Sequence, residues 1–135
     1  MAYDVQEIEG VGAKFAAKLA GIGIHNTDDL LSKARTPAGR AAVSDEGLIR
    51  PDLVLTWANR ADLMRLKGVG GQFAELLNVA GVDTIKELRR RNAANLRAKM
   101  VEINESRKVS RTAPSEAQVA GWVEQAKSLE PSLEY

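Results

Sequence analysis

A stretch of the chain that occurs twice limits the fold more than any other feature of the sequence. IEGVGAKFAAKLAGIGIHNTDDL, residues 8–30, returns 58 positions later as LKGVGGQFAELLNVAGVDTIKEL, residues 66–88. The first copy holds four glycines in a pattern that is otherwise helical, although glycine inside a helix costs about 1 kcal/mol relative to alanine. Three of them recur in the second copy: Gly10 as Gly68, Gly12 as Gly70 and Gly23 as Gly81. These three therefore have a task in the fold, whereas Gly21 is matched by Val79 and has no repeated task.

A second pair of matching segments extends the repeat. LVLTWANRADLM, residues 53–64, and QVAGWVEQAKSL, residues 118–129, share the pattern Val-x-x-Trp-x-x-x-Ala-x-x-Met/Leu, which places its apolar residues on one face of a helix. Their offset is 65, so the second copy carries about seven extra residues, which we expect within residues 104–115. We predict one compact domain, residues 1–135, made of two repeats over approximately 1–65 and 66–130 and a short C-terminal tail.

The local signals predict an all-α fold of roughly eight short helices. No segment alternates apolar and polar residues as a strand would. Residues suited to cap a helix start precede several apolar runs: Asn26, Thr36, Thr84, Asn92 and Ser115. We expect the two glycines of each Gly-Val-Gly to reverse the chain between helices through positive φ or close approach. Val11 and Val69 would then point into the core, and Gly23 and Gly81 would end helices in the left-handed conformation.

These features resemble the helix-hairpin-helix superfamily, whose signature is a Gly-hydrophobic-Gly hairpin followed by a helix with a small residue and a leucine. Over nearly its full length the chain is also similar to a bacterial family of unknown function built from two such hairpins. The segments that carry this similarity are IEGVG, WANRADLMRLKGVG, AGVDTIKELRRRN and PSEAQVAGWVEQAK. The resemblance implies two pseudo-equivalent helix-hairpin-helix units and binding of DNA without sequence specificity. We expect the halves to bury their Phe15/Phe73 and Trp57/Trp122 faces against each other.

Backbone amides at a glycine turn and at the following helix start form a site for phosphate. The formal net charge is only +1, but basic residues are concentrated between Lys86 and Arg111, and the tail after Thr112 is acidic. In the second hairpin Gln72 stands where the first has Lys14, and Glu75 follows early in the helix, which weakens that hairpin as a phosphate site. The candidate residues for nucleic acid are Gly10, Gly12, Ala13, Lys14, Lys18, Gly68, Gly70, Gly71, Arg89, Arg90 and Arg91.

A second hypothesis is a protein–protein adaptor. The same glycines are needed simply to close a hairpin, so they do not by themselves indicate a ligand. The small net charge, the acidic tail and the carboxylates Glu9 and Glu75 beside the hairpins favour this alternative. The sequence leaves open whether the partner is DNA, RNA or a protein, and it leaves the oligomeric state open.

Other functions find little support in the residue content. The chain has no cysteine, which excludes disulfides, thiolate metal sites and cysteine nucleophiles. His25 is the single histidine, and GVGGQ, residues 68–72, lacks the lysine and the hydroxyl residue of a P-loop. We therefore expect no catalytic residue, metal or cofactor, and no enzyme activity. No apolar run approaches the ~20 residues of a membrane span, and the first residues do not resemble a signal peptide, so we expect a cytoplasmic protein without membrane contact.

Overall fold

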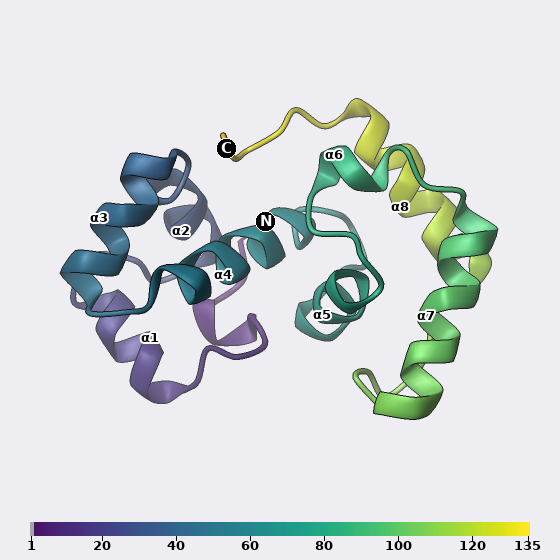
Figure 1. The fold of residues 1–135 in the computed structure, drawn as a ribbon, viewed down its shortest axis with the longest axis horizontal. Helices are drawn as coiled ribbons and strands as arrows, with labels where there is room; N and C mark the ends of the chain where they lie inside the picture. Colours follow the sequence, from purple (N-terminus) through teal and green to yellow (C-terminus); the bar gives the residue numbers. More distant parts are fainter. Residues whose placement is uncertain (1) are drawn as a thin grey trace.

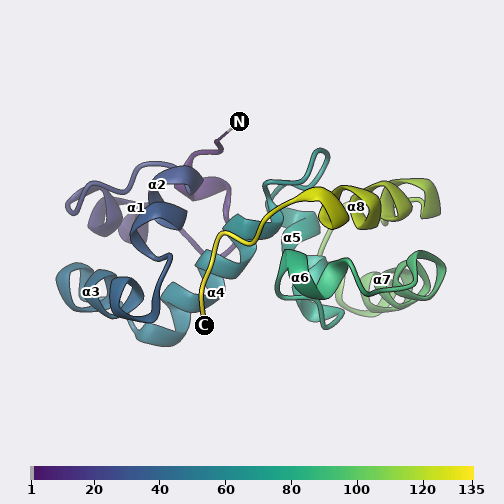
Figure 2. The same ribbon diagram turned by 90° about the horizontal axis from the view of Figure 1, so that it is seen from above.

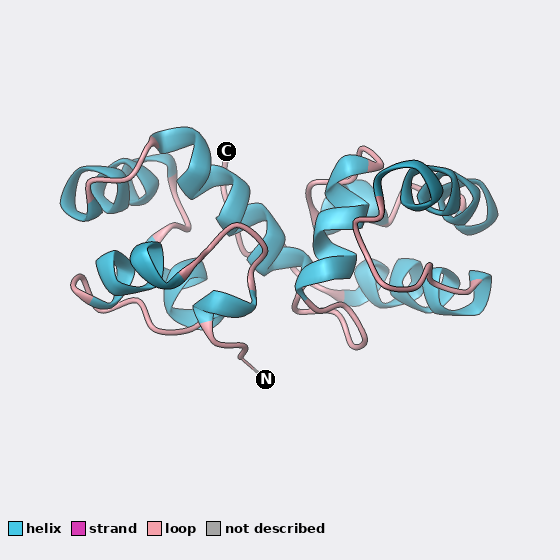
Figure 3. Ribbon diagram, turned by 90° about the horizontal axis from the view of Figure 1, so that it is seen from below, coloured by secondary structure: helices cyan, strands magenta, loops and turns pink. Residues whose placement is uncertain are grey.

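A computed structural model describes residues 2–135, and this part of the chain forms eight α-helices and one short 3-10 helix (Figure 1). No strand is present among these residues, only an isolated antiparallel bridge between Asp4 and Asn26 (Figure 3). The all-α prediction and the expected number of helices are confirmed. Met1, where the predicted domain begins, lies outside the described residues. The elements are η1 (Val5–Glu7), α1 (Ala13–Ala20), α2 (Thr27–Lys33), α3 (Pro37–Gly47), α4 (Pro51–Leu63), α5 (Gly71–Val79), α6 (Ile85–Leu88), α7 (Ala93–Arg107) and α8 (Glu116–Ser128).

The two copies of the repeat fold in the same way. We call η1 and α1–α4 the first half and α5–α8 the second half (Figures 1 and 2). In the first half α2 and α3 pack on α4, and in the second half α6 and α7 pack on α8. The last helix of each half, α4 or α8, is therefore the one on which the two preceding helices pack. Helix α4 also contacts α5, which belongs to the second half.

The predicted helix starts are present. At the start of α2, α3, α6, α7 and α8, a side-chain oxygen of the residue before the helix accepts a hydrogen bond from a backbone N–H of the first turn. The reciprocal capping box forms between Ser115 and Gln118, where each side chain bonds the other residue's amide. At α6 only half of that arrangement is present, because Thr84 accepts from the Glu87 amide while the Glu87 carboxylate lies near the Thr84 hydroxyl.

Each tryptophan packs within its own half. The Phe15 and Trp57 rings meet edge to face with centroids 5.0 Å apart, and the Phe73 and Trp122 rings are 5.3 Å apart. The expectation that the two halves bury these faces against each other is therefore wrong. The reason is the turn before the first helix of each half, which places the phenylalanine of that helix on the tryptophan of the same half.

Only the first glycine of each Gly-Val-Gly adopts a positive φ. The angle is +96° at Gly10 and +88° at Gly68, whereas it is −85° at Gly12 and −92° at Gly70. The expectation that both glycines act through positive φ or close approach is thus correct for the first and wrong for the second, whose φ is ordinary and whose Cβ position has no atom within 4 Å. A Cβ on Gly10 would lie 3.3 Å from Nε1 of Trp57, so this turn requires glycine for its φ and has a tryptophan close behind it.

The remaining expectations for the repeated glycines and valines are confirmed. Gly23 and Gly81 end their helices at φ +82° and +97°. Val11, between the two glycines of the first turn, is only 4% exposed, and Val69 is fully buried.

Arg60 on α4 joins the two halves. Its Nη1 donates to the carbonyl oxygen of Glu9 at 2.7 Å, and its Nε donates to Oδ1 of Asn78 on α5 at 3.2 Å. The Glu75 carboxylate lies 3.7 Å from the same guanidinium. Gly71 packs so closely under the carbonyl of Glu7 that a Cβ there would overlap the oxygen. The buried apolar residues of both halves form one core.

Within residues 2–135, each helix is too short or too polar to reach across a bilayer.

The turn geometry predicts that alanine destabilises the fold more at Gly10 than at Gly12. Gly10→Ala should lower the free energy of unfolding by about 2 kcal/mol, because alanine is strained at positive φ and its methyl group would press on Trp57. Gly12→Ala should cost less than about 1 kcal/mol, because its φ is ordinary and no atom lies within 4 Å of the added Cβ. Urea unfolding followed by tryptophan fluorescence measures both. Equal losses would contradict this account of the turn.

Candidate nucleic-acid interface

Three α-helices among residues 2–135 begin without a side-chain cap, and two of them follow the Gly-Val-Gly turns. Gly12 precedes α1 and Gly70 precedes α5, and neither has a side chain that could bond the free amides. Helix α4 also lacks a side-chain cap, but its first residue is Pro51, which has no amide hydrogen. The first amides of α1 and α5 therefore point outward together with the positive end of the helix dipole, an arrangement that attracts anions.

The glycines directly before these helices are not explained by the packing of the chain. At Gly12 and Gly70 the φ angles suit any residue, and no atom lies within 4 Å of the position of a Cβ. Glycine leaves the backbone amides of the turn accessible at close range. An approaching phosphate oxygen therefore meets no side chain of Gly12 or Gly70.

In the first half, the cationic side chain at this helix start is Lys14. It is exposed in the first turn of α1, next to Ala13, and forms no ion pair within residues 2–135. Lys18, expected to help it, is engaged elsewhere. Its Nζ donates to the carbonyl oxygen of Leu48 at 3.1 Å and lies 5.6 Å from the centre of the Phe15 ring. Lys18 thus holds the end of α3 against α1.

In the second half, the loop between α7 and α8 replaces the missing lysine. Oε1 of Gln72 accepts hydrogen bonds from the Ser110 hydroxyl at 3.3 Å and from the Arg111 amide at 3.2 Å. These bonds hold the loop beside the start of α5. A pocket of about 550 Å³ lies between them, lined by residues 68, 70–73 and 110–112. The exposed Arg111 therefore stands at the second turn as Lys14 stands at the first.

The extra residues of the second repeat build this loop. Helix α7 has 15 residues against 11 in α3, and residues 108–115 connect α7 to α8 where residues 48–50 suffice in the first half. The insertion lies where the sequence predicts it, but the sequence indicates Arg111 only as part of a basic segment. The signal that could have found it is the coincidence of the insertion with the replacement of lysine by Gln72.

Carboxylates and close packing partly cover the second turn. Gly71 lies under the Glu7 carbonyl, so this glycine is required by the contact between the halves. A Cβ at Gly71 would be 3.6 Å from Cγ of Glu9, which brings that acidic side chain near the start of α5. Glu75, by contrast, is occupied by Arg60. The first turn is therefore the more open of the two.

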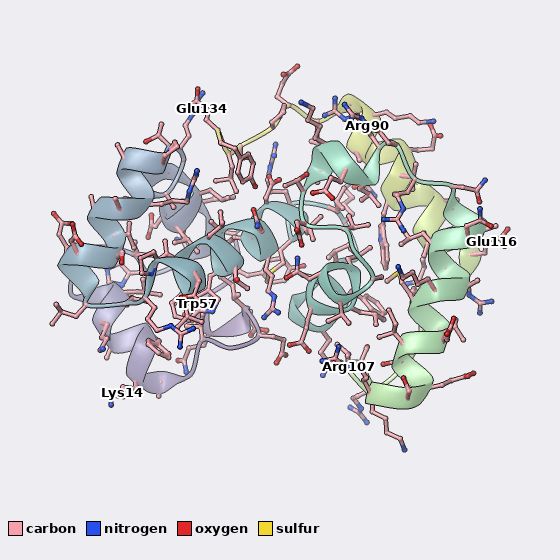
Figure 4. All side chains as sticks on the ribbon, viewed as in Figure 1. Lys14, Trp57, Arg90, Arg107, Glu116 and Glu134 are labelled. Carbon is pink, nitrogen blue, oxygen red and sulfur yellow. The ribbon has the colours of Figure 1, made fainter. Side chains whose placement is uncertain are left out.

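The basic segment does not form one surface. The Arg89 guanidinium donates to the carbonyl oxygen of Leu129 at 2.9 Å and secures the end of α8. Arg91 lies beside Gly81, away from the turns. Arg90 is at the opposite edge of the molecule from Arg107 and Lys14 (Figure 4). Residues 89–91 are thus separated from the two helix starts, while the basic residues near the end of α7 lie close to the second one.

The comparisons with known proteins agree with the resemblance in the sequence at the level of the family. Residues 9–129 match the family described as "Domain of unknown function (DUF4332)". No curated protein and no solved structure matches the chain.

The role of Gln72 predicts a local effect. Gln72→Ala should speed hydrogen exchange at the Arg111 amide, because its acceptor is lost, and should cost about 1 kcal/mol of stability. The neighbouring Ser110 amide bonds Oδ1 of Asn104 and should stay protected. Gln72→Glu keeps an acceptor oxygen and should leave the Arg111 amide slow to exchange. Equal acceleration at both amides of the alanine variant would contradict this account.

Proposed function

The chain belongs to the DUF4332 family, and we propose that it is a non-catalytic tandem helix-hairpin-helix module that binds nucleic acid through its two Gly-Val-Gly turns. Backbone amides and nearby cations contact phosphates in this proposal, so binding is independent of base sequence. DNA is the partner that the resemblance to the superfamily implies.

One observation carries the proposal: the helices after both turns start without a cap and behind a glycine that the fold does not need. At Gly12 and Gly70 an alanine would meet no atom within 4 Å and would have an ordinary φ. At the five α-helices with a side-chain cap, an oxygen of the capping residue already accepts one of the first backbone amides. Open amides at the two equivalent places favour a ligand that supplies its own oxygen atoms, as a phosphate does.

The charges around the two turns predict weak and salt-dependent binding. Lys14 serves the first turn, and Arg111 serves the second with Lys108 on the same loop. A few phosphate contacts of this kind release few counterions, and the net charge of +1 adds little long-range attraction. We expect the first turn to contribute more, because Glu7 and Glu9 restrict access to the second.

The packing at the second turn also favours the adaptor as a second candidate. Gly71 is fixed under Glu7, and a carboxylate stands beside the start of α5. In an adaptor the turns would be structural, and the partner would be a protein. The two candidates differ in whether Lys14 contributes to binding a polyanion.

Charge reversals at two edges of the molecule test the proposal. Binding of a labelled DNA duplex, single strand and branched junction should be measured by fluorescence anisotropy at about 50 and about 200 mM salt. Lys14→Glu and Arg111→Glu should each weaken binding, and each should reduce the slope of log K against log salt by about 1.

Arg90→Glu is the matched control, because it changes the charge by the same amount at the edge opposite Lys14 (Figure 4). It should change the affinity much less than Lys14→Glu. If the wild-type chain fails to bind at low salt, or if all three reversals weaken binding equally, the turns are not the binding site.

A further inference from the structure

The C-terminal segment lies on the half of the molecule to which it does not belong. Residues 129–135, which we call the strap, leave α8 in the second half and run across to the first half (Figure 2). The strap contains no helix or strand, and Glu134 ends beside α2 and α3 (Figure 4). The strap is therefore an extended segment held by side chains and backbone groups of another unit.

Backbone groups fix its position. The Glu134 amide donates to the carbonyl oxygen of Arg35 at 2.7 Å, and Nη2 of Arg40 donates to the Glu134 carbonyl oxygen at 2.7 Å. Nη1 of Arg40 also donates to the carbonyl oxygens of Ala34 and Arg35 at the end of α2. Arg40 is thus held in place by α2 and can receive any extended peptide, because a main-chain carbonyl is present in every sequence.

Side chains add selectivity. Leu133 is 6% exposed, whereas Glu134 points outward, with one carboxylate oxygen 3.6 Å from Nε of Arg35. The Tyr135 ring lies 5.3 Å from the Arg40 guanidinium, and its hydroxyl donates to Oδ1 of Asn59. Desolvation raises the pKa of Tyr135 to about 12. The strap therefore presents an aliphatic, an acidic and an aromatic residue in succession to this surface.

The strap covers this surface only in part, and the contacts of its exposed side chains with the surface are weak. Tyr135 is 64% exposed, and both members of the Arg35–Glu134 pair are mostly in solvent, where ion pairs contribute little. A pocket of about 630 Å³ lies between the strap, α4 and α6, and another of about 290 Å³ lies between α3 and α4. Both reach Leu55, an exposed apolar residue of α4. The surface extends beyond the strap on either side of Tyr135.

We propose that this surface, formed by the end of α2 with α3 and α4, is a recognition groove for an extended peptide of a partner protein, and that the strap is its intramolecular occupant. The partner peptide carries an aliphatic residue followed by an acidic and an aromatic residue. It displaces the strap, whose high effective concentration keeps the groove closed to weak competitors. Glu134 and Lys14 lie at opposite edges of the molecule, so the groove is separate from the first turn (Figure 4).

A labelled peptide with the sequence of residues 128–135, SLEPSLEY, tests the groove in the full-length chain. Leu133→Asp in the protein should release the strap, because a carboxylate replaces its buried anchor. This variant should bind the peptide at least about tenfold more tightly than the wild-type chain, since the internal competitor is gone. The same peptide with aspartate in place of the leucine that corresponds to Leu133 is the matched control and should not bind.

Two further variants make the result decisive. Tyr135→Ala removes an exposed side chain, so the fold is retained, and it should give an intermediate gain in peptide affinity. Adding Arg40→Ala to Leu133→Asp should abolish the gain, because the groove loses its carbonyl donor and its contact with the aromatic ring. Equal binding by the wild-type and both strap variants, or no binding by variants with unchanged circular dichroism, would overturn the proposal. DNA binding is measured separately and does not bear on this outcome.

Discussion

The contact between a tryptophan and a glycine turn supports each half of this structure. Trp57 stands behind Gly10, and Trp122 stands behind Gly68, with 3.3 Å from each indole nitrogen to the place where a Cβ would be. The turn needs positive φ at that glycine and directs the next helix along the tryptophan, where a phenylalanine packs on the ring. Because the tryptophan packs against the inner side of the turn, the start of that helix lies on the outer side. The same contact that builds the core therefore exposes the amides.

The two halves keep this frame and differ in how they complete it. In the first half Arg60 donates to the carbonyl of the residue before the turn glycine, and in the second half Gln125 accepts from the amide of Lys67 at the matching place. Both bonds tie the turn to the fourth helix, although donor and acceptor are exchanged. The turns then acquire their charge differently, from the helix itself in one half and from an inserted loop in the other. The two halves therefore share the packing of turn, tryptophan and phenylalanine, and they differ in the charged residues at the surface of the turn.

The part of the candidate site that the sequence predicts is local. The turn glycines and Lys14 lie within a few residues of one helix start, so the pattern places them without any long-range contact. Lys18 is expected at the site because it lies one helical turn after Lys14, and Arg89 because it belongs to an arginine run, yet each donates to a carbonyl oxygen far along the chain. Arg111 was not assigned to it, because its position depends on bonds to Gln72, 39 residues earlier. A run of basic residues shows only that positive charge is present. Which of these side chains stay free for a ligand depends on contacts with residues distant in sequence.

The sequence by itself determined the helices, their caps and the repeated turns, because periodicity, capping and the φ preference of glycine act within one or two turns of chain. It also placed the extra residues of the second copy between the correct helices. Tertiary structure alone decided that each tryptophan packs in its own half and that residues 129–135 cross to the other half. Those arrangements depend on which buried surfaces fit and which carbonyl groups find donors. Both are properties of segments distant in sequence that meet only in the folded chain.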